Sequence, residues 1–238
     1  MTQESIILIV TTVSLAFIHT LTGPDHYLPF VVISKARNWT LKRTIWFTVL
    51  CGLGHVGSSV LLGLIGIAFG IAVSSLELWE GQRGSVISVL ILAFGFVYFI
   101  WGVFRAVKNK PHRHIHSHGE AIHEHEHTHN NEHVHVHTQP ANDKISITPW
   151  ILFTIFIFGP CEPLIPLVMY PAAQNNTALL ILVTLLFTLV TIGTMITLVV
   201  LALKGLSFLP MKKIERYNHA LAGFTILLCG IGMVFFGL

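Results

Sequence analysis

Long apolar runs separated by short polar segments make up almost the whole chain. Six runs reach the roughly 20 residues that a helix needs to cross a bilayer. They cover residues 5–34, 44–73, 85–107, 149–171, 178–204 and 217–238. The runs are continuous, whereas the strands of a membrane barrel alternate apolar and polar positions. The pattern therefore predicts an all-α polytopic membrane protein with six transmembrane helices.

Composition narrows the class further. Hydrophobic residues make up 53% of the 238 residues and charged residues only 11%, less than half of the roughly 25% typical of globular domains. This excludes a soluble enzyme and a disordered chain, so we expect no catalysis, no prosthetic group and no nucleic-acid partner. The lipid bilayer is the expected surrounding, and the formation of a homo-oligomer stays open.

The distribution of basic residues predicts an orientation. All but one of the 14 Lys and Arg residues lie in or beside the three loops on one side of a six-span topology, and the exception is Arg83. Cytoplasmic loops of membrane proteins carry the excess of Lys and Arg. We therefore expect a multi-pass protein of a bacterial inner membrane, with both termini outside and residues 108–148 in the cytoplasm.

Two halves of the chain resemble each other. GPDHYLPFVV begins at Gly23 and GPCEPLIPLVM at Gly159, and FGFVYFIWG begins at Phe94 and CGIGMVFFG at Cys229. The near-equal offsets predict a duplicated unit of three helices, residues 1–107 and 149–238. An odd number of spans gives the two copies opposite orientations, which is the inverted-repeat plan of secondary transporters. The first helix of each copy is expected to break at its Gly-Pro pair.

Polar residues gather at the two predicted breaks. Of the eleven Asp and Glu residues, only Asp25 and Glu162 lie well inside the predicted spans. Gly ends one half-helix and Pro suits the first turn of the next. Asp25, His26, Cys161 and Glu162 are then expected in a first turn, where the helix dipole favours anionic ligands. The alternative is a structural role, in which a carboxylate caps its own helix break.

Two further histidines extend this set. His19 lies two helical turns before His26, and His55 lies in the small-residue stretch GLGHVGSS of the second span. A lone membrane histidine is more often an interhelical hydrogen bonder than a ligand. A set that mixes His, Asp, Glu and Cys suits a borderline divalent ion such as nickel, cobalt or zinc. The predicted metal site is Asp25, His26, Cys161 and Glu162, with His19 and His55 as second choices.

The loop between the halves is rich in histidine. Eleven of the chain's 15 histidines lie in residues 111–137, mostly two residues apart. Such a tract forms no packed core and is compositionally a metal binder. A plain low-complexity linker and a pH sensor are the alternatives. The candidate loop ligands are His112, His114, His116, His118, His123, His125, His127, His129, His133, His135 and His137.

With these features together, the chain resembles the NicO and UreH-like nickel/cobalt transporters of the LysE superfamily, which are related to the CcdA/DsbD-type membrane domains. In the nickel/cobalt permease signature H-A-x-D-A-D-H, Asp25 and His26 match the closing pair, and TLTGPDH follows His19. In the second half, FGPCEPLIP resembles the proline-flanked cysteine motif of the thiol-electron conduits. The resemblance covers nearly the whole chain and implies transport of nickel or cobalt.

The expected function is secondary transport of a divalent transition metal, nickel or cobalt first and zinc next, with the ion as substrate. A cytoplasmic histidine loop that donates ions fits export slightly better than import. The alternatives are a CcdA/DsbD-type thiol-electron carrier, an exporter of a small sulfite-like anion, and an accessory membrane protein that serves a metalloenzyme. A lone cysteine in the second repeat cannot cycle with a partner in the first, where Asp25 stands at that position.

The orientation is testable by labelling. Because the basic residues gather on one side, a cysteine introduced by Asn130→Cys should lie in the cytoplasm. A membrane-impermeant thiol reagent should label it only after the cells are permeabilised. Labelling in intact cells would reverse the orientation and the role expected of the loop.

Overall fold

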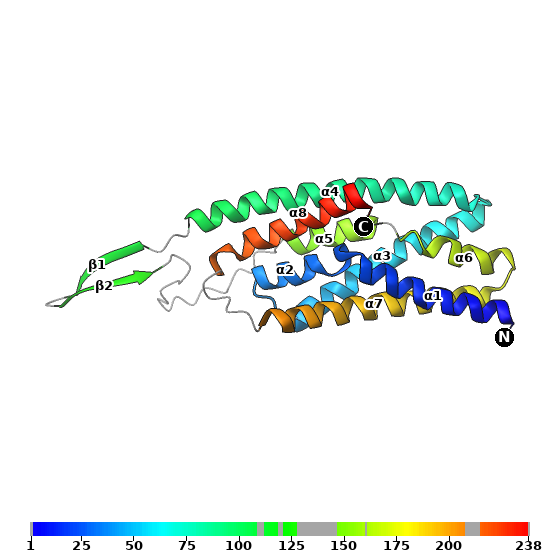
Figure 1. Ribbon diagram of the computed structural model, residues 1–238, viewed down its shortest axis with the longest axis horizontal. Coiled ribbons are helices and arrows are strands. Elements are labelled where there is room, and N and C mark those ends of the chain that lie inside the picture. Colours follow the sequence, from blue (N-terminus) through cyan, green and yellow to red (C-terminus); the bar gives the residue numbers. More distant parts are fainter. Residues whose placement is uncertain are drawn as a thin grey trace.

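The computed structural model describes residues 2–108, 112–118, 121–127, 147–159, 161–207 and 215–237. These form a bundle of helices and one hairpin (Figure 1). In chain order the elements are α1 (Gln3–Thr22), η1 (Pro24–His26), α2 (Leu28–Ala36), α3 (Leu41–Phe69), α4 (Val73–Lys108), β1 (His112–His118), β2 (Ala121–His127), α5 (Ile147–Phe158), α6 (Leu164–Ala173), α7 (Thr177–Ser207), η3 (Glu215–Tyr217) and α8 (Asn218–Phe236).

The helices have the length and apolarity of a multi-pass membrane protein. Among the described residues, five helices are long and apolar enough to cross a membrane, namely α1, α3, α4, α7 and α8. Helices α5 and α6 are shorter, with 12 and 10 residues. Apart from the hairpin the described elements are helices, as expected of an all-α membrane protein, and residues 149–171, which the sequence predicted as one span, are divided between two short helices.

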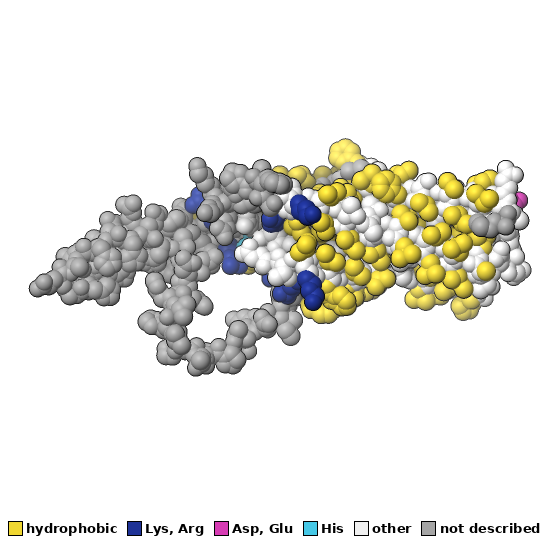
Figure 2. All heavy atoms as spheres, turned by 90° about the horizontal axis from the view of Figure 1, so that it is seen from below, with side chains coloured by type: hydrophobic (Ala, Val, Ile, Leu, Met, Phe, Trp, Pro, Cys, Tyr) yellow, Lys and Arg dark blue, Asp and Glu magenta, His cyan; other side chains and the backbone are white. Residues whose placement is uncertain are grey.

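Apolar side chains cover the outside of the bundle. Trp46 and Phe69 are 63% and 78% exposed, and many other large hydrophobic residues face outward. In a bilayer such surfaces contact lipid instead of water. Figure 2 shows these side chains as a broad apolar belt, and the visible Lys and Arg side chains gather at one end of the belt.

Both predicted helix breaks are present. Helix α1 ends at Thr22, the residues Pro24–His26 form a single 3₁₀ turn, and α2 follows from Leu28. In the second half α5 ends at Phe158 and α6 begins at Leu164. The chain therefore interrupts both helices at the glycine of the repeated Gly-Pro pair.

The half-helices begin later than the sequence predicted. Asp25 and His26 lie in the 3₁₀ turn, and Cys161 and Glu162 lie in the linker before α6, not in the first turn of an α-helix. A second proline explains the first case: Pro29 lacks an N–H, which costs least in the first turn of a helix. The α-helix therefore starts at Leu28, so that Pro29 falls in its first turn.

Helix α4 also begins earlier than predicted. It starts at Val73 instead of residue 85 and spans 36 residues. The added turns contain Leu76 and Glu80, both of which have no exposed surface. The helix therefore carries a buried carboxylate, Glu80, that the sequence did not assign to membrane depth.

Helices α4 and α8 pack closely along their length. Four glycines, two from each helix, lie so close to the other backbone that an added Cβ would overlap it. The facing pairs step in opposite directions along the two helices, which makes the packing antiparallel: Leu92 with Gly230, Gly95 with Leu227, Phe99 with Gly223 and Gly102 with Ala220. Small residues at such contacts let membrane helices approach each other closely.

The hairpin places histidines opposite one another. Strands β1 and β2 pair antiparallel, with the Cα of His112 opposite His127, His114 opposite His125 and His116 opposite His123. The side chains of both strands and the remaining loop histidines, His129, His133, His135 and His137, lie outside the described residues. Metal binding by this loop therefore stays a prediction.

The glycine contacts between α4 and α8 predict a selective sensitivity to alanine. In Gly95→Ala and Gly223→Ala the new methyl group meets backbone, which cannot move aside without separating the helices. Overpacking of this kind costs about 1–3 kcal/mol. Both variants should lower the yield and thermal stability of detergent-purified protein.

Gly193→Ala in α7 is the matched control, because nothing lies within 4 Å of a Cβ at that position. Its yield should equal that of the wild type. Equal thermal stability of all three variants would mean that close approach of α4 and α8 contributes little to the fold.

Candidate metal centre

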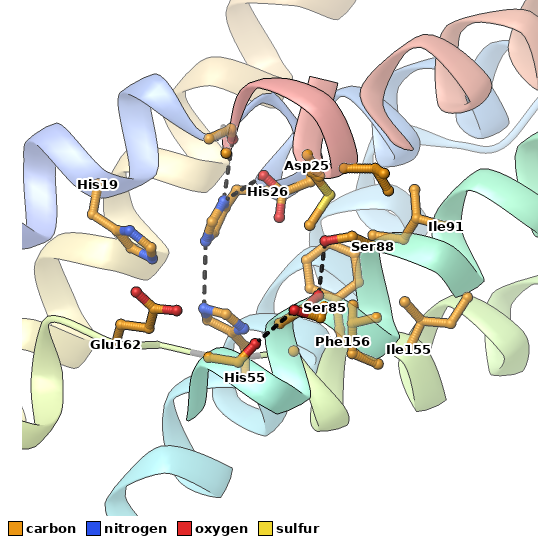
Figure 3. A pocket seen from close by; sticks show the side chains of 18 of the residues that line it. His19, Asp25, His26, His55, Ser85, Ser88, Ile91, Ile155, Phe156 and Glu162 are labelled. Carbon is orange, nitrogen blue, oxygen red and sulfur yellow. Dashed lines mark hydrogen bonds and ion pairs between the residues drawn. The ribbon is translucent and has the colours of Figure 1, made fainter. Parts of the chain in front are cut away.

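A cavity of about 610 Å³ lies where the first helix break meets α3, α4 and the second break. Its polar lining includes Asp25 and Glu162 together with three histidines, and its apolar lining includes Ile87, Ile91, Ile155 and Phe156. Figure 3 shows the two kinds of lining on different sides of the cavity. The cavity is therefore chemically two-sided, with donor atoms gathered on one wall.

Three histidines from three different elements form that wall. His19 lies in the last turn of α1, His26 ends the 3₁₀ turn, and His55 lies in the middle of α3. One side-chain ligand atom of each lies within 4.8 Å of the others. His26 and His55 are buried, at 3% exposed each. The ring centroids of His19 and His26 lie 4.8 Å apart, so the two rings are neighbours across the helix break.

The hydrogen bonds of His26 fix its tautomer. Its Nδ1 lies 3.1 Å from the carbonyl oxygen of Gly23 and 3.1 Å from Oδ1 of Asp25. A carbonyl oxygen can only accept, so Nδ1 carries the proton and donates. Nε2 is then free to bind an ion when the ring is neutral. This is the arrangement in which a carboxylate orients a metal-binding histidine.

The spacing of two imidazole nitrogens matches that of metal ligands. Nε2 of His26 lies 3.3 Å from Nε2 of His55. Two nitrogens bound at about 2.0–2.1 Å to one tetrahedral ion lie roughly 3.3–3.4 Å apart. In the metal-free protein one of these atoms donates a hydrogen bond to the other. An ion that replaces the shared proton needs little movement of either ring.

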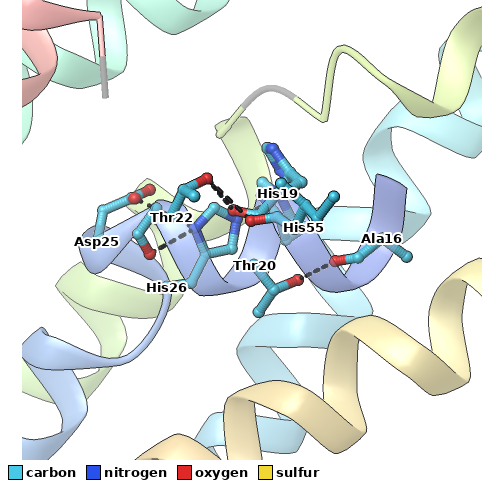
Figure 4. Close-up of polar contacts among 9 residues, drawn as sticks. Ala16, His19, Thr20, Thr22, Asp25, His26 and His55 are labelled. Carbon is cyan, nitrogen blue, oxygen red and sulfur yellow. Dashed lines mark hydrogen bonds and ion pairs between the residues drawn. The ribbon is translucent and has the colours of Figure 1, made fainter. Parts of the chain in front are cut away.

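The third histidine has a free nitrogen at the cavity. Nε2 of His19 is buried and has no hydrogen-bond partner among the described residues. The hydroxyls of the nearby threonines bond to backbone instead, Thr20 donating to the carbonyl of Ala16 and Thr22 to that of Ile18 (Figure 4). A buried polar atom without a partner costs about 1–3 kcal/mol. A bound ligand would remove that cost.

Glu162 reaches the same cavity from the second break. Its side chain is exposed within the structure and lines the cavity together with the three histidines. In Figure 3 it is drawn on the side of His19 and His55. Asp25 is held by His26, whereas Glu162 offers a carboxylate to the open space. Five of the six predicted site residues therefore meet in one place.

The sixth, Cys161, lies elsewhere. It has no exposed surface and packs in an apolar cluster with Ala16, Val56 and Leu164, away from the cavity lining. Cys51 lies in a second apolar cluster, and all three cysteines of the chain are free. Glu162 follows Cys161 in an irregular linker, where neighbouring side chains point in different directions. The sequence predicted both as ligands, and the backbone turns only one of them toward the cavity.

Sequence reasoning missed a buried ion pair beside the cavity. Nη1 of Arg83 lies 2.7 Å from Oε1 of Glu80, and the Glu80 side chain has no exposed surface. The sequence predicted Arg83 only as the one basic residue outside. The signal was available, since opposite charges three residues apart lie on one face of a helix.

Comparison of the chain with protein-family models, with curated proteins and with solved structures finds no match. The chemistry of the cavity is therefore read from its own residues. Three imidazoles, a carboxylate that orients one of them and a second carboxylate facing the same space form a donor set for a divalent transition-metal ion.

Proposed function

We propose that the protein is a secondary membrane transporter of divalent transition-metal ions, with nickel or cobalt as the first substrates to test and export as the first direction. The resemblance to NicO and UreH-like transporters agrees with this function and is itself part of the proposal. The observation that carries it is the meeting of His19, His26 and His55 at one cavity.

The donor atoms favour a borderline metal over other substrates. Imidazole binds zinc, copper, iron and nickel, whereas magnesium and calcium prefer oxygen ligands. Ionisable residues inside a membrane bundle commonly mark an ion pathway. The thiol-electron alternative is less well supported, since Cys161 and Cys51 lie in two separate apolar clusters.

The helix contacts support an inverted repeat of six spans. Helix α1 packs on α7, and α5, which would be its counterpart, packs on α3. In the same way α2 contacts α7 and α8, and α6 contacts α3 and α4. The remaining counterparts contact each other, α3 with α7 and α4 with α8. Exchanging the two halves therefore maps this set of contacts onto itself.

In this arrangement each broken pair, α1–α2 and α5–α6, counts as one span. The two breaks then meet from opposite halves near the cavity, as expected when paired broken helices hold the substrate. The basic residues would place the histidine-rich loop in the cytoplasm, where it would collect ions for the cavity. A transporter that works by alternating access would expose the three histidines to each side in turn.

Cell-associated metal tests the transport proposal. Cells that express the wild type should contain less nickel or cobalt than control cells during metal exposure, if export is the direction. His19→Ala, His26→Ala and His55→Ala each remove one nitrogen donor and should abolish the difference. Metal content should be measured together with the amount of protein in the membrane.

His219→Ala is the matched control, because His219 is bonded to Tyr98 in a separate aromatic cluster. It should leave the metal content at the wild-type level. Wild-type activity in any of the three cavity variants would remove that histidine from the site, and no effect of the wild type on any metal would end the proposal.

The role of Asp25 predicts a graded effect. Asp25→Asn keeps an acceptor for Nδ1–H of His26 but removes the charge that makes the ring a better ligand. Loss of such a partner lowers metal affinity by about 10–100-fold. The half-saturating metal concentration of transport should rise in that range. An unchanged value would show that the carboxylate only caps the helix break.

A further inference from the structure

The ion pair of Arg83 and Glu80 reaches three separate elements. Besides Glu80, Arg83 bonds through Nη2 to Oγ of Ser58 in α3, at 2.9 Å. The same nitrogen lies 3.3 Å from the carbonyl oxygen of Gly159 and 3.4 Å from that of Ile157. Those two carbonyls belong to the end of α5, where the second break leaves them without helical partners. The guanidinium of α4 therefore caps a helix end that belongs to the other half of the chain.

The carbonyl groups freed at the two breaks accept hydrogen bonds from different kinds of donor. In the first break the carbonyl of Gly23 accepts a hydrogen bond from His26, three residues later. Gly159 is the counterpart of Gly23 in the repeat, and the residue three positions later is Glu162. An ionised carboxylate cannot donate to a carbonyl. The second break therefore needs a donor from outside, and Arg83 is that donor.

The same contacts tie the second break to the helix that carries His55. Ser58, which accepts from Arg83, donates in turn to the carbonyl of His55 at 2.9 Å. Oγ of the next residue, Ser59, accepts from the backbone N–H of Cys161 at 3.2 Å. The linker is thus fixed to α3 immediately before Glu162. These bonds fix the position of the backbone from which the Glu162 side chain enters the cavity.

Glu80 keeps the guanidinium in this position. Its carboxylate is fully buried and occupies Nη1 of Arg83, while Nη2 faces the serine and the two carbonyls. The Arg83 side chain is partly buried, and such a charge is tolerated when it is paired and its other donors are bonded. Because Glu80 supplies the neutralising charge, the carboxylate of Glu162 is left to face the cavity and does not have to pair with Arg83.

We propose that Arg83 is a positioning residue for the metal site: by capping the second helix break it holds Glu162 at the cavity as a ligand on the side of His19 and His55. The inference rests on the proposed transport function. In this proposal Arg83 binds no ion itself. It determines where Glu162, the ligand from the other repeat, lies.

A double-mutant cycle on the full-length chain tests this role. Wild type, Arg83→Gln, Glu162→Gln and the double variant are reconstituted in proteoliposomes, and Co²⁺ flux is followed over a range of metal concentrations. Each single substitution should raise the half-saturating Co²⁺ concentration about tenfold or more. The double variant should be no worse than Glu162→Gln alone, because residues that act through one contact are not additive.

Two further variants keep the test decisive. Gln82→Ala, at the exposed neighbour of Arg83, is the control and should match the wild type. Arg83→Lys keeps the charge but not the fork that reaches several acceptors at once. It should give a smaller increase than Arg83→Gln, and this increase should also vanish in the Glu162→Gln background. If Arg83→Gln does not insert in membranes, the cycle is run with Arg83→Lys.

The outcomes of the cycle separate the positioning role of Arg83 from the transport function. Additive increases, or wild-type flux in both Arg83 variants, would overturn the positioning role while leaving metal transport intact. An unchanged Glu162→Gln variant would do the same, since there would be no ligand to position. Absence of both Co²⁺ and Ni²⁺ flux in the wild type would overturn the transport function and, with it, the role of Arg83.

Discussion

The need to satisfy every backbone polar group inside the membrane governs this structure. A continuous helix meets that need by itself, whereas a broken helix leaves carbonyl and N–H groups that only the protein can satisfy. The chain breaks two helices and brings both breaks to one cavity. Two side chains satisfy such groups at the breaks, His26 at Gly23 and Arg83 at Gly159 and Ile157. The candidate ligands are the side-chain atoms that are not used to satisfy backbone groups at the breaks.

The two breaks divide the chemistry of the cavity between them. The first supplies imidazoles, because its histidine can donate to the freed carbonyl through Nδ1 and still offer Nε2 to the cavity. The second supplies a carboxylate, which cannot cap the break and so depends on a donor from α4. The two breaks thereby contribute different donor groups to one cavity. Mixed nitrogen and oxygen donors are suited to borderline divalent ions.

The scaffold around the cavity is held by close helix packing more than by polar contacts. Glycines on α4 and α8 bring the two backbones together in an antiparallel pair, with Gly95 and Gly230 at corresponding positions of the two halves. This pair places the start of α4, with Glu80 and Arg83, beside the second break. A change that separates the two helices should therefore also disturb the site, although no glycine of the pair touches the donor atoms.

The sequence by itself determined the membrane class, the two helix breaks and the five residues that meet at the cavity, out of six that it predicted, because apolar run length, Gly-Pro pairs and intramembrane charges are local signals. It could not determine where the half-helices start, since Pro24 and Pro29 compete for the first turn. It also predicted Cys161 as a ligand, and the direction of that side chain depends on how the linker is fixed to Ser59 of α3. Only the tertiary structure decided that Arg83 and Glu80 belong beside the site, because their partners lie on other helices, and the burial that gives such contacts their energy exists only after the helices have packed.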